Sequence, residues 1–144
     1  MIDEIARATH SDAEPPVRDA DAGRAVRVAV RLGVAMLASG AQSDEAEATM
    51  RAILRSAGLP DATATISYST VSVSHIDART AVTTTAVQAV RAWRPDFNQL
   101  VGVATLAKAT EDGRIDLHDA DEQLDAIVCQ KQPYPAWLRF LAPS

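Results

Sequence analysis

The spacing of apolar residues changes twice along this chain, and these changes limit the possible folds more than any other feature. From about residue 21 to residue 58, apolar side chains recur every three or four positions, which is the spacing of one helix face. From 62 to 90 they alternate with Ser and Thr, and β-branched residues dominate, as in half-buried strands. The helical spacing returns after Pro95. Strands grouped between two groups of helices predict an α+β fold rather than an alternating α/β fold.

Glycine and aspartate residues divide each helical region into two helices. Gly40 is placed to end the first helix with a left-handed cap, and Gly58, followed by Pro60, ends the second. Asp96 can cap a third helix and Asp116 a fourth. The side chains expected to face the core are Ala25, Val28, Ala29, Leu32 and Met36 in the first helix, Ala46, Met50, Ile53, Leu54 and Ala57 in the second, and Leu117, Leu124, Ile127 and Val128 in the fourth, while the third carries the apolar residues Phe97, Leu100, Val103, Ala104 and Ala107.

The central block contains three candidate strands. The stretches "ATATISYS" and "TVSVSHID" follow each other directly, and "RTAVTTTAVQAV" comes after a turn at Asp77-Ala78-Arg79. Such short connections favour antiparallel pairing of neighbouring strands. The predicted α+β fold therefore consists of two N-terminal helices, a three-stranded antiparallel meander and two C-terminal helices.

The charge balance is mildly acidic, with 14 Lys and Arg residues against 19 Asp and Glu residues and a net charge of −5. This balance argues against a nucleic-acid partner, which would require clustered positive charge. Arg24, Arg27 and Arg31 do line up on one face of the first helix. A row of guanidinium groups can bind phosphate, but a solvated helix face explains the same spacing, and we predict the latter.

We expect a single folded domain over residues 21–130. Residues 1–20 are acidic and interrupted by prolines, which predicts a flexible tail, and residues 131–144 form a separate segment rich in proline and aromatic residues. The strongly apolar run "LVGVATLA" is far shorter than the roughly 20 residues that a membrane span requires, so the chain is predicted to be soluble. The single cysteine, Cys129, cannot form an internal disulfide, which fits a reducing cytoplasm.

The patterns that could hold a metal ion are weak. The stretch "EDGRIDLHDAD" is similar to the centre of a calcium-binding loop, but Lys108 would occupy the first ligand position, and a helix end followed by a helix start explains the same residues. His10, His75, His118 and Cys129 are scattered and show none of the paired spacings of zinc ligands. We therefore predict no metal and no other cofactor.

His75 is the first candidate for a catalytic base if the chain is an enzyme. Asp77 lies on the same face of the strand, whereas the two serines of this strand point to the opposite face and cannot reach the imidazole. A nucleophile would have to come from the hairpin tip, at Ser69 or Thr70. A histidine that makes an ordinary hydrogen bond at a strand end is the simpler interpretation. The alternative left open is a small hydrolase that acts on a peptide or an amino-acid derivative.

Four stretches of the chain, taken in order, resemble the cytoplasmic N-terminal domain of the threonine/serine exporter family. They are the helix pair "RLGVAMLASGAQSDEAEATMRAILRSAGL", the hairpin "ATISYSTVSVSH", the helix pair "DFNQLVGVATLAKATEDGRIDLHDADEQLDAI" and the segment "PYPAWL", which in the family leads into the first membrane helix. The resemblance covers roughly residues 25 to 140. The positions that match the family's motifs are Ser39, Gly40, Ala41, Glu47, Pro133, Tyr134 and Pro135.

The resemblance implies a soluble domain at the cytoplasmic face of the cell membrane, with a regulatory, gating or assembly role in amino-acid export. Its partner would be a membrane transporter domain of the same or a neighbouring protein. A homo-oligomer is also expected, because a three-stranded sheet has exposed edges that can pair with another copy. Two alternatives stay open beside this interpretation: the small hydrolase, and a module that serves only homo-oligomerisation.

Overall fold

The computed structural model describes residues 19–91 and 93–129 of the 144-residue chain. Its elements are α2 (Asp19–Ser39), α3 (Ser43–Ser56), β1 (Thr63–Ser67), β2 (Thr70–Ile76), β3 (Thr83–Ala89), α4 (Phe97–Glu111) and α5 (Leu117–Cys129). This order, with a three-stranded antiparallel sheet, confirms the predicted α+β fold. Apart from residues 19 and 20, the predicted N-terminal tail lies outside the described residues, as does the whole of the predicted segment 131–144.

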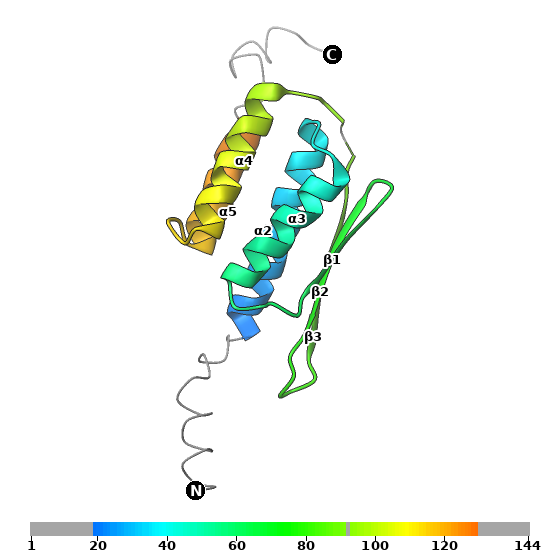
Figure 1. Ribbon diagram of the computed structural model, residues 1–144, viewed down its shortest axis with the longest axis vertical. Coiled ribbons are helices and arrows are strands. Elements are labelled where there is room, and N and C mark those ends of the chain that lie inside the picture. The colour runs from blue at the N-terminus through cyan, green and yellow to red at the C-terminus, as the bar shows by residue number, and fades with distance from the viewer. Residues whose placement is uncertain (1–18, 92, 130–144) are drawn as a thin grey trace, which may run out of the picture.

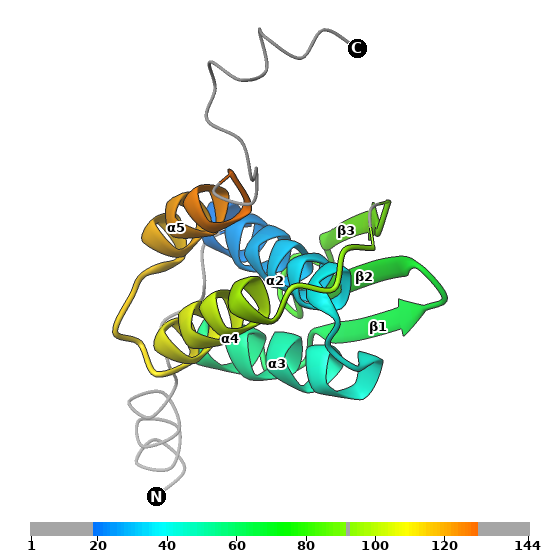
Figure 2. The same cartoon turned by 90° about the horizontal axis from the view of Figure 1, so that it is seen from above.

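The elements form three layers, as Figures 1 and 2 show. The sheet is one outer layer, α2 and α3 cover its inner face, and α4 and α5 lie on the other side of these two helices. α2 is in the middle layer and contacts β2, β3, α3, α4 and α5. A helix with neighbours on nearly every side must be apolar nearly all round, which explains the high content of alanine, valine and leucine in α2.

The hydrophobic core is centred on α2. The predicted stripe of Ala25, Val28, Ala29, Leu32 and Met36 is fully buried, and so are the α3 residues predicted to meet it, except for the half-buried Ala57. Gly33 of α2 faces Met50 of α3, and a Cβ added at position 33 would be 2.5 Å from the Sδ atom of Met50. A side chain at position 33 would therefore require the buried Met50 side chain to move.

The predicted helix ends are confirmed at the residues that signal them. Gly40 has a φ of +112°, and its N–H donates to the carbonyl of Leu37 at 3.1 Å, while the N–H of Ala41 donates to the carbonyl of Met36 at 3.0 Å. This pair of bonds is the Schellman arrangement that ends many helices. Asp96 caps α4 by accepting the N–H of Gln99 at 3.1 Å.

Val128 was wrongly predicted to face the core, since 42% of its surface is exposed. α5 packs against α2 and α4, and Ala120, Leu124 and Ile127 line that face. One residue further along a helix the side chain is rotated by about 100°, which turns Val128 away from its neighbours. Phe97, at the start of α4, is also mostly exposed, at 77%.

Arg31 departs from the solvated stripe predicted for the α2 arginines. Its guanidinium group donates hydrogen bonds to Asp121 and Asp125 of α5, whereas Arg24 and Arg27 are exposed. Burial lowers the pKa of Arg31, but the hydrogen bonds to the two carboxylates outweigh burial and raise that pKa above its ordinary value. The two ion pairs fasten α5 to the middle layer.

Candidate functional site

His75 lies near the end of β2, on the inner face of the sheet that also carries Val71 and Val73. The side chain is half-buried, and its cross-strand neighbour on β3 is Thr84. The Nδ1 atom is buried and has no hydrogen-bond partner among the described residues. The ordinary hydrogen bond predicted for this histidine is therefore not found at Nδ1. A catalytic base needs a partner that orients its ring, and no such partner is found at this atom.

Asp77 closes the turn between β2 and β3. Its Oδ1 atom accepts the N–H of Arg79 at 2.8 Å and the N–H of Thr80 at 3.3 Å. These two backbone hydrogen bonds hold the pKa of the Asp77 carboxyl below its ordinary value. The backbone N–H of Asp77 also donates to the carbonyl of Val82 at 2.9 Å. The carboxylate thus stabilises the turn, and no hydrogen bond joins it to His75.

Ser69 and Thr70 lie at the opposite end of β2 from His75. Thr70 pairs with Ser67, which leaves Tyr68 and Ser69 as the two residues of the β1–β2 turn. At about 3.4 Å per strand residue, Thr70 is roughly 17 Å along β2 from His75. The structure therefore does not bring the candidate nucleophiles to the candidate base. The hydrolase alternative stays a prediction, without a supporting arrangement of these four residues.

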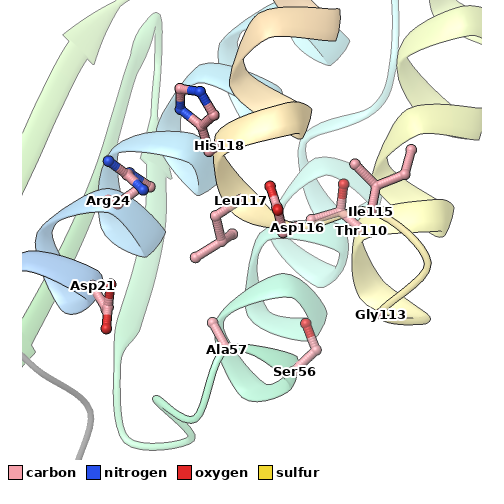
Figure 3. Close-up of a pocket in the computed structure, with 10 residues that line it drawn as sticks. All are labelled: Asp21, Arg24, Ser56, Ala57, Thr110, Gly113, Ile115, Asp116, Leu117 and His118. Atoms are coloured by element: carbon pink, nitrogen blue, oxygen red, sulfur yellow. The ribbon is translucent and has the colours of Figure 1, made fainter.

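A cavity of about 400 Å³ opens where the start of α2, the end of α3 and the connection between α4 and α5 meet (Figure 3). Its lining combines charged and apolar side chains from helix ends that are far apart in the sequence. The residues that line it are Asp21, Arg24, Ser56, Ala57, Thr110, Gly113, Ile115, Asp116, Leu117 and His118. Sequence reasoning missed this cavity, and the only signal was the "EDGRIDLHDAD" stretch, which supplies half of the lining.

The polar groups around this cavity mostly serve the helices that carry them. Ser56 and Thr110 donate their hydroxyls to backbone carbonyls of their own helices, at 2.9 and 2.8 Å. Asp116 caps α5 by accepting the N–H three residues further on, at 2.7 Å. In Figure 3 the side chains of Asp21 and Arg24 point away from each other. The cavity is large enough for a small polar molecule, and its two oppositely charged α2 side chains do not point to a common centre.

The motif positions at the end of α2 form a structural junction with α4. The buried Ser39 hydroxyl donates to the carbonyl of Ala35 at 2.7 Å and accepts a hydrogen bond from Nε2 of Gln99 at 2.8 Å. The backbone N–H of Asp96 also donates to the carbonyl of Ser39 at 3.1 Å. Gln99 was missed by sequence reasoning, because its position belongs to the buried face of α4, where the helical spacing leads one to expect an apolar residue. The motif positions Pro133, Tyr134 and Pro135 lie outside the described residues.

The motif position Glu47 connects α3 to the edge of the sheet. Its Oε1 atom accepts the backbone N–H of Ile66 in β1 at 2.9 Å, and its Oε2 atom lies 3.6 Å from the guanidinium of Arg51. β1 is an edge strand, so the N–H of Ile66 points away from β2 and needs another acceptor. Glu47 supplies this acceptor and so ties α3 to the outer side of β1 at Ile66.

We expect the substitution Glu47→Ala to lower the free energy of unfolding by about 1 kcal/mol, because the N–H of Ile66 loses its partner. Glu47→Gln keeps an acceptor at the same position and should cost less. Urea unfolding measures both, and amide hydrogen exchange at Ile66 should speed up in the alanine variant. Glu45→Ala, an exposed residue of the same helix, is the control. A loss that is equal for Glu45→Ala and Glu47→Ala would contradict the role given to Glu47.

The described residues therefore form an α+β domain with a closed core and no assembled catalytic set of the predicted kind. Within residues 19–91 and 93–129, no group of three or more His, Cys, Asp or Glu residues is arranged to hold a metal ion. In the same part of the chain, no helix is both long and apolar enough to cross a membrane.

Comparison with protein-family models identifies the family of this chain. The family model described as a putative threonine/serine exporter matches residues 27–144, which is most of the chain. The chain belongs to this family, as its sequence resemblance predicted. Membership relates the chain to threonine and serine export and associates it with a membrane exporter. No curated protein and no solved structure matches the chain significantly.

Proposed function

We propose that this chain supplies the cytoplasmic part of a threonine/serine exporter and that its role is to assemble, gate or regulate the exporter. The observation that carries the proposal is the family match, which begins within α2 and covers every later element. The partner is a membrane transporter domain of the same or a neighbouring protein, on the cytoplasmic face of the membrane. The described helices pack around α2 and form a hydrophobic core. This packing supports a role for the chain outside the transport path itself.

One end of the molecule offers a surface for this membrane partner. Exposed apolar side chains occur where α4 begins and α5 ends, and these two helix ends lie at the same end of the molecule in Figure 1. We call Trp93, Phe97, Val101 and Val128 the apolar end, with exposures of 53%, 77%, 47% and 42%. Exposed apolar patches on soluble domains mark interaction sites. We propose that the apolar end contacts the membrane part of the exporter.

The test is threonine efflux from cells that express this chain together with the membrane part of the exporter. The substitution Val101→Asp places a charge in the proposed contact and should weaken that contact about thirtyfold, with a matching loss of efflux, since losing a central contact residue costs roughly 2 kcal/mol. Val82→Asp is a matched control, because Val82 is 48% exposed and lies beside the β2–β3 turn, at the other end of the molecule. It should leave efflux unchanged.

Two outcomes would contradict the proposal. If cells that lack this chain export threonine as well as cells that have it, the chain has no part in export. If Val101→Asp and Val82→Asp export equally well, the apolar end is not the contact surface. Circular dichroism of the isolated variants confirms that each still folds, so that a loss of efflux can be assigned to the contact.

A second role, self-association of the chain, is favoured by a separate observation. The two edges of the sheet differ: Glu47 of α3 bonds to the edge at β1, whereas the outward side of β3 is exposed. Within an exporter, pairing of this domain would hold two copies together, which is the assembly role in its simplest form.

A further inference from the structure

The backbone hydrogen bonds show which residues of β3 face the free edge. The N–H of Val90 donates to the carbonyl of Ser69 at 2.6 Å, and the N–H of Asp77 donates to the carbonyl of Val82 at 2.9 Å. Both bonds lie in the register of the β2–β3 ladder and use even-numbered residues on the β3 side. Backbone groups in a strand alternate in direction. The N–H and C=O groups of the odd-numbered residues Thr83, Thr85, Val87 and Ala89 therefore point away from β2.

This edge lacks the features that usually protect an edge strand. The β3 sequence TTTAVQA contains no charged residue and no proline, and its odd-numbered side chains are all exposed. Among the described residues, no backbone hydrogen bond outside the ladder reaches these four residues. Natural proteins normally blunt such an edge with charge, proline, a bulge or a covering segment, because a row of unpaired backbone groups recruits another strand.

We infer that β3 pairs with β3 of a second copy of this chain, antiparallel and about a two-fold axis. The free backbone groups require an extended strand as partner, and each copy carries one such strand, so a single contact satisfies both edges. The side chains that meet are uncharged in both copies. The acidic residues that make the chain negative lie outside all three strands, so they do not oppose this contact.

The directions of the backbone groups also fix the register. Outward-facing residues must meet outward-facing residues, so odd-numbered positions pair with odd-numbered positions. The register that uses every outward-facing residue of β3 places Thr83 opposite Ala89 of the second copy. It also places Thr85 opposite Val87 of that copy. A shift in one direction would bring in Ala81, whose φ of +58° does not belong to a strand, and a shift in the other direction would bring in the charged Arg91, which lies beyond the end of β3. The result is a continuous sheet of both copies, with α2 covering the inner face of each half.

The inference deepens the proposed self-association and rests on it, but not on a role in export. Its test compares two double variants of the 144-residue chain by sedimentation equilibrium. Thr85→Lys with Val87→Lys places like charges directly opposite each other across the two-fold axis and should weaken dimerisation by roughly a hundredfold. Thr85→Glu with Val87→Lys places opposite charges at the same pairs and should keep the dimer. Both variants lose the same hydroxyl contact between Thr85 and Ser74, so this loss is the same in the two monomers.

Amide hydrogen exchange on the unmodified chain provides a second readout that needs no variant. The amides of Thr84, Ala86 and Gln88 bond to β2 and should be protected at every protein concentration. The amides of Thr83, Thr85, Val87 and Ala89 should become protected only at concentrations where the dimer forms.

The possible outcomes distinguish self-association of the chain from the particular β3–β3 interface. A strict monomer at high concentration overturns self-association and this interface together. A dimer that survives the Thr85→Lys, Val87→Lys change, with no concentration-dependent protection of the odd-numbered amides, keeps self-association but overturns this interface. Protection of those amides only when another protein is added identifies a different strand as the partner and also overturns pairing between copies.

Discussion

Replacing Leu32 by alanine is expected to lower the free energy of unfolding by about 3 kcal/mol. Leu32 is fully buried in α2, the helix that contacts the sheet on one side and α4 and α5 on the other. Removing a buried leucine side chain loses its transfer free energy and leaves a cavity, at a cost of about 2–5 kcal/mol. The cavity here would lie between three layers that are each held by other contacts, so collapse around it should be limited. Urea unfolding followed by circular dichroism measures the change.

Leu117→Ala is the matched control, because it removes the same atoms from a half-buried position at the start of α5. Its cost should be about 1 kcal/mol, since the side chain already has solvent on one side. The dependence of the unfolding free energy on urea should stay the same in both variants if only stability changes. A Leu32→Ala variant that is no less stable than Leu117→Ala would show that α2 is not the centre of the core.

The fold was predictable because its signals are local. The change from helical to alternating spacing identifies each element, and a single residue such as Gly40 or Asp96 signals where a helix ends or begins. The structure confirms those signals because each acts on backbone groups within about four residues of itself. Val128 shows the limit of the same reasoning. Periodicity indicates an apolar position but not how wide a face the neighbouring elements cover.

The candidate site was less predictable, because it depends on contacts between distant residues. Strand alternation correctly placed His75 with Val71 and Val73 on the inner face. It could not show that the carboxylate of Asp77 is used by backbone N–H groups of the turn. It also could not show that Nδ1 of His75 has no hydrogen-bond partner among the described residues. The hydrogen bond between Ser39 and Gln99 joins residues 60 positions apart, and no local pattern marks either residue as half of a pair.

The residues at the family motif positions have structural roles in this domain. Ser39 joins the end of α2 to the start of α4, Gly40 ends α2 with its bond to the carbonyl of Leu37, and Glu47 joins α3 to the edge of β1. Each of these residues satisfies a backbone or buried polar group that would otherwise lack a partner. Their roles in the described residues are therefore architectural. The open edge of β3 and the apolar end are the surfaces that we propose for function.

The second large effect is expected from Gly33→Ala, which should lower the free energy of unfolding by about 2 kcal/mol. A Cβ at this position would lie 2.5 Å from Sδ and 3.1 Å from Cγ of Met50, which is fully buried. Overpacking of this kind costs about 1–3 kcal/mol, and the higher helix propensity of alanine offsets part of it. Gly23→Ala on the same helix is the matched control, because no atom lies within 4 Å of its added Cβ. That change should raise stability by up to about 1 kcal/mol.

A double-mutant cycle with Met50→Ala identifies the origin of the loss. If the contact with Met50 is the cause, Gly33→Ala should cost nothing in a Met50→Ala background, and there it should even add stability through helix propensity. The coupling free energy would then be at least as large as the whole effect of Gly33→Ala. Additive losses would instead place the strain in the α2 backbone. Coupling would show that position 33 must be a glycine because the side chain of Met50 packs against it.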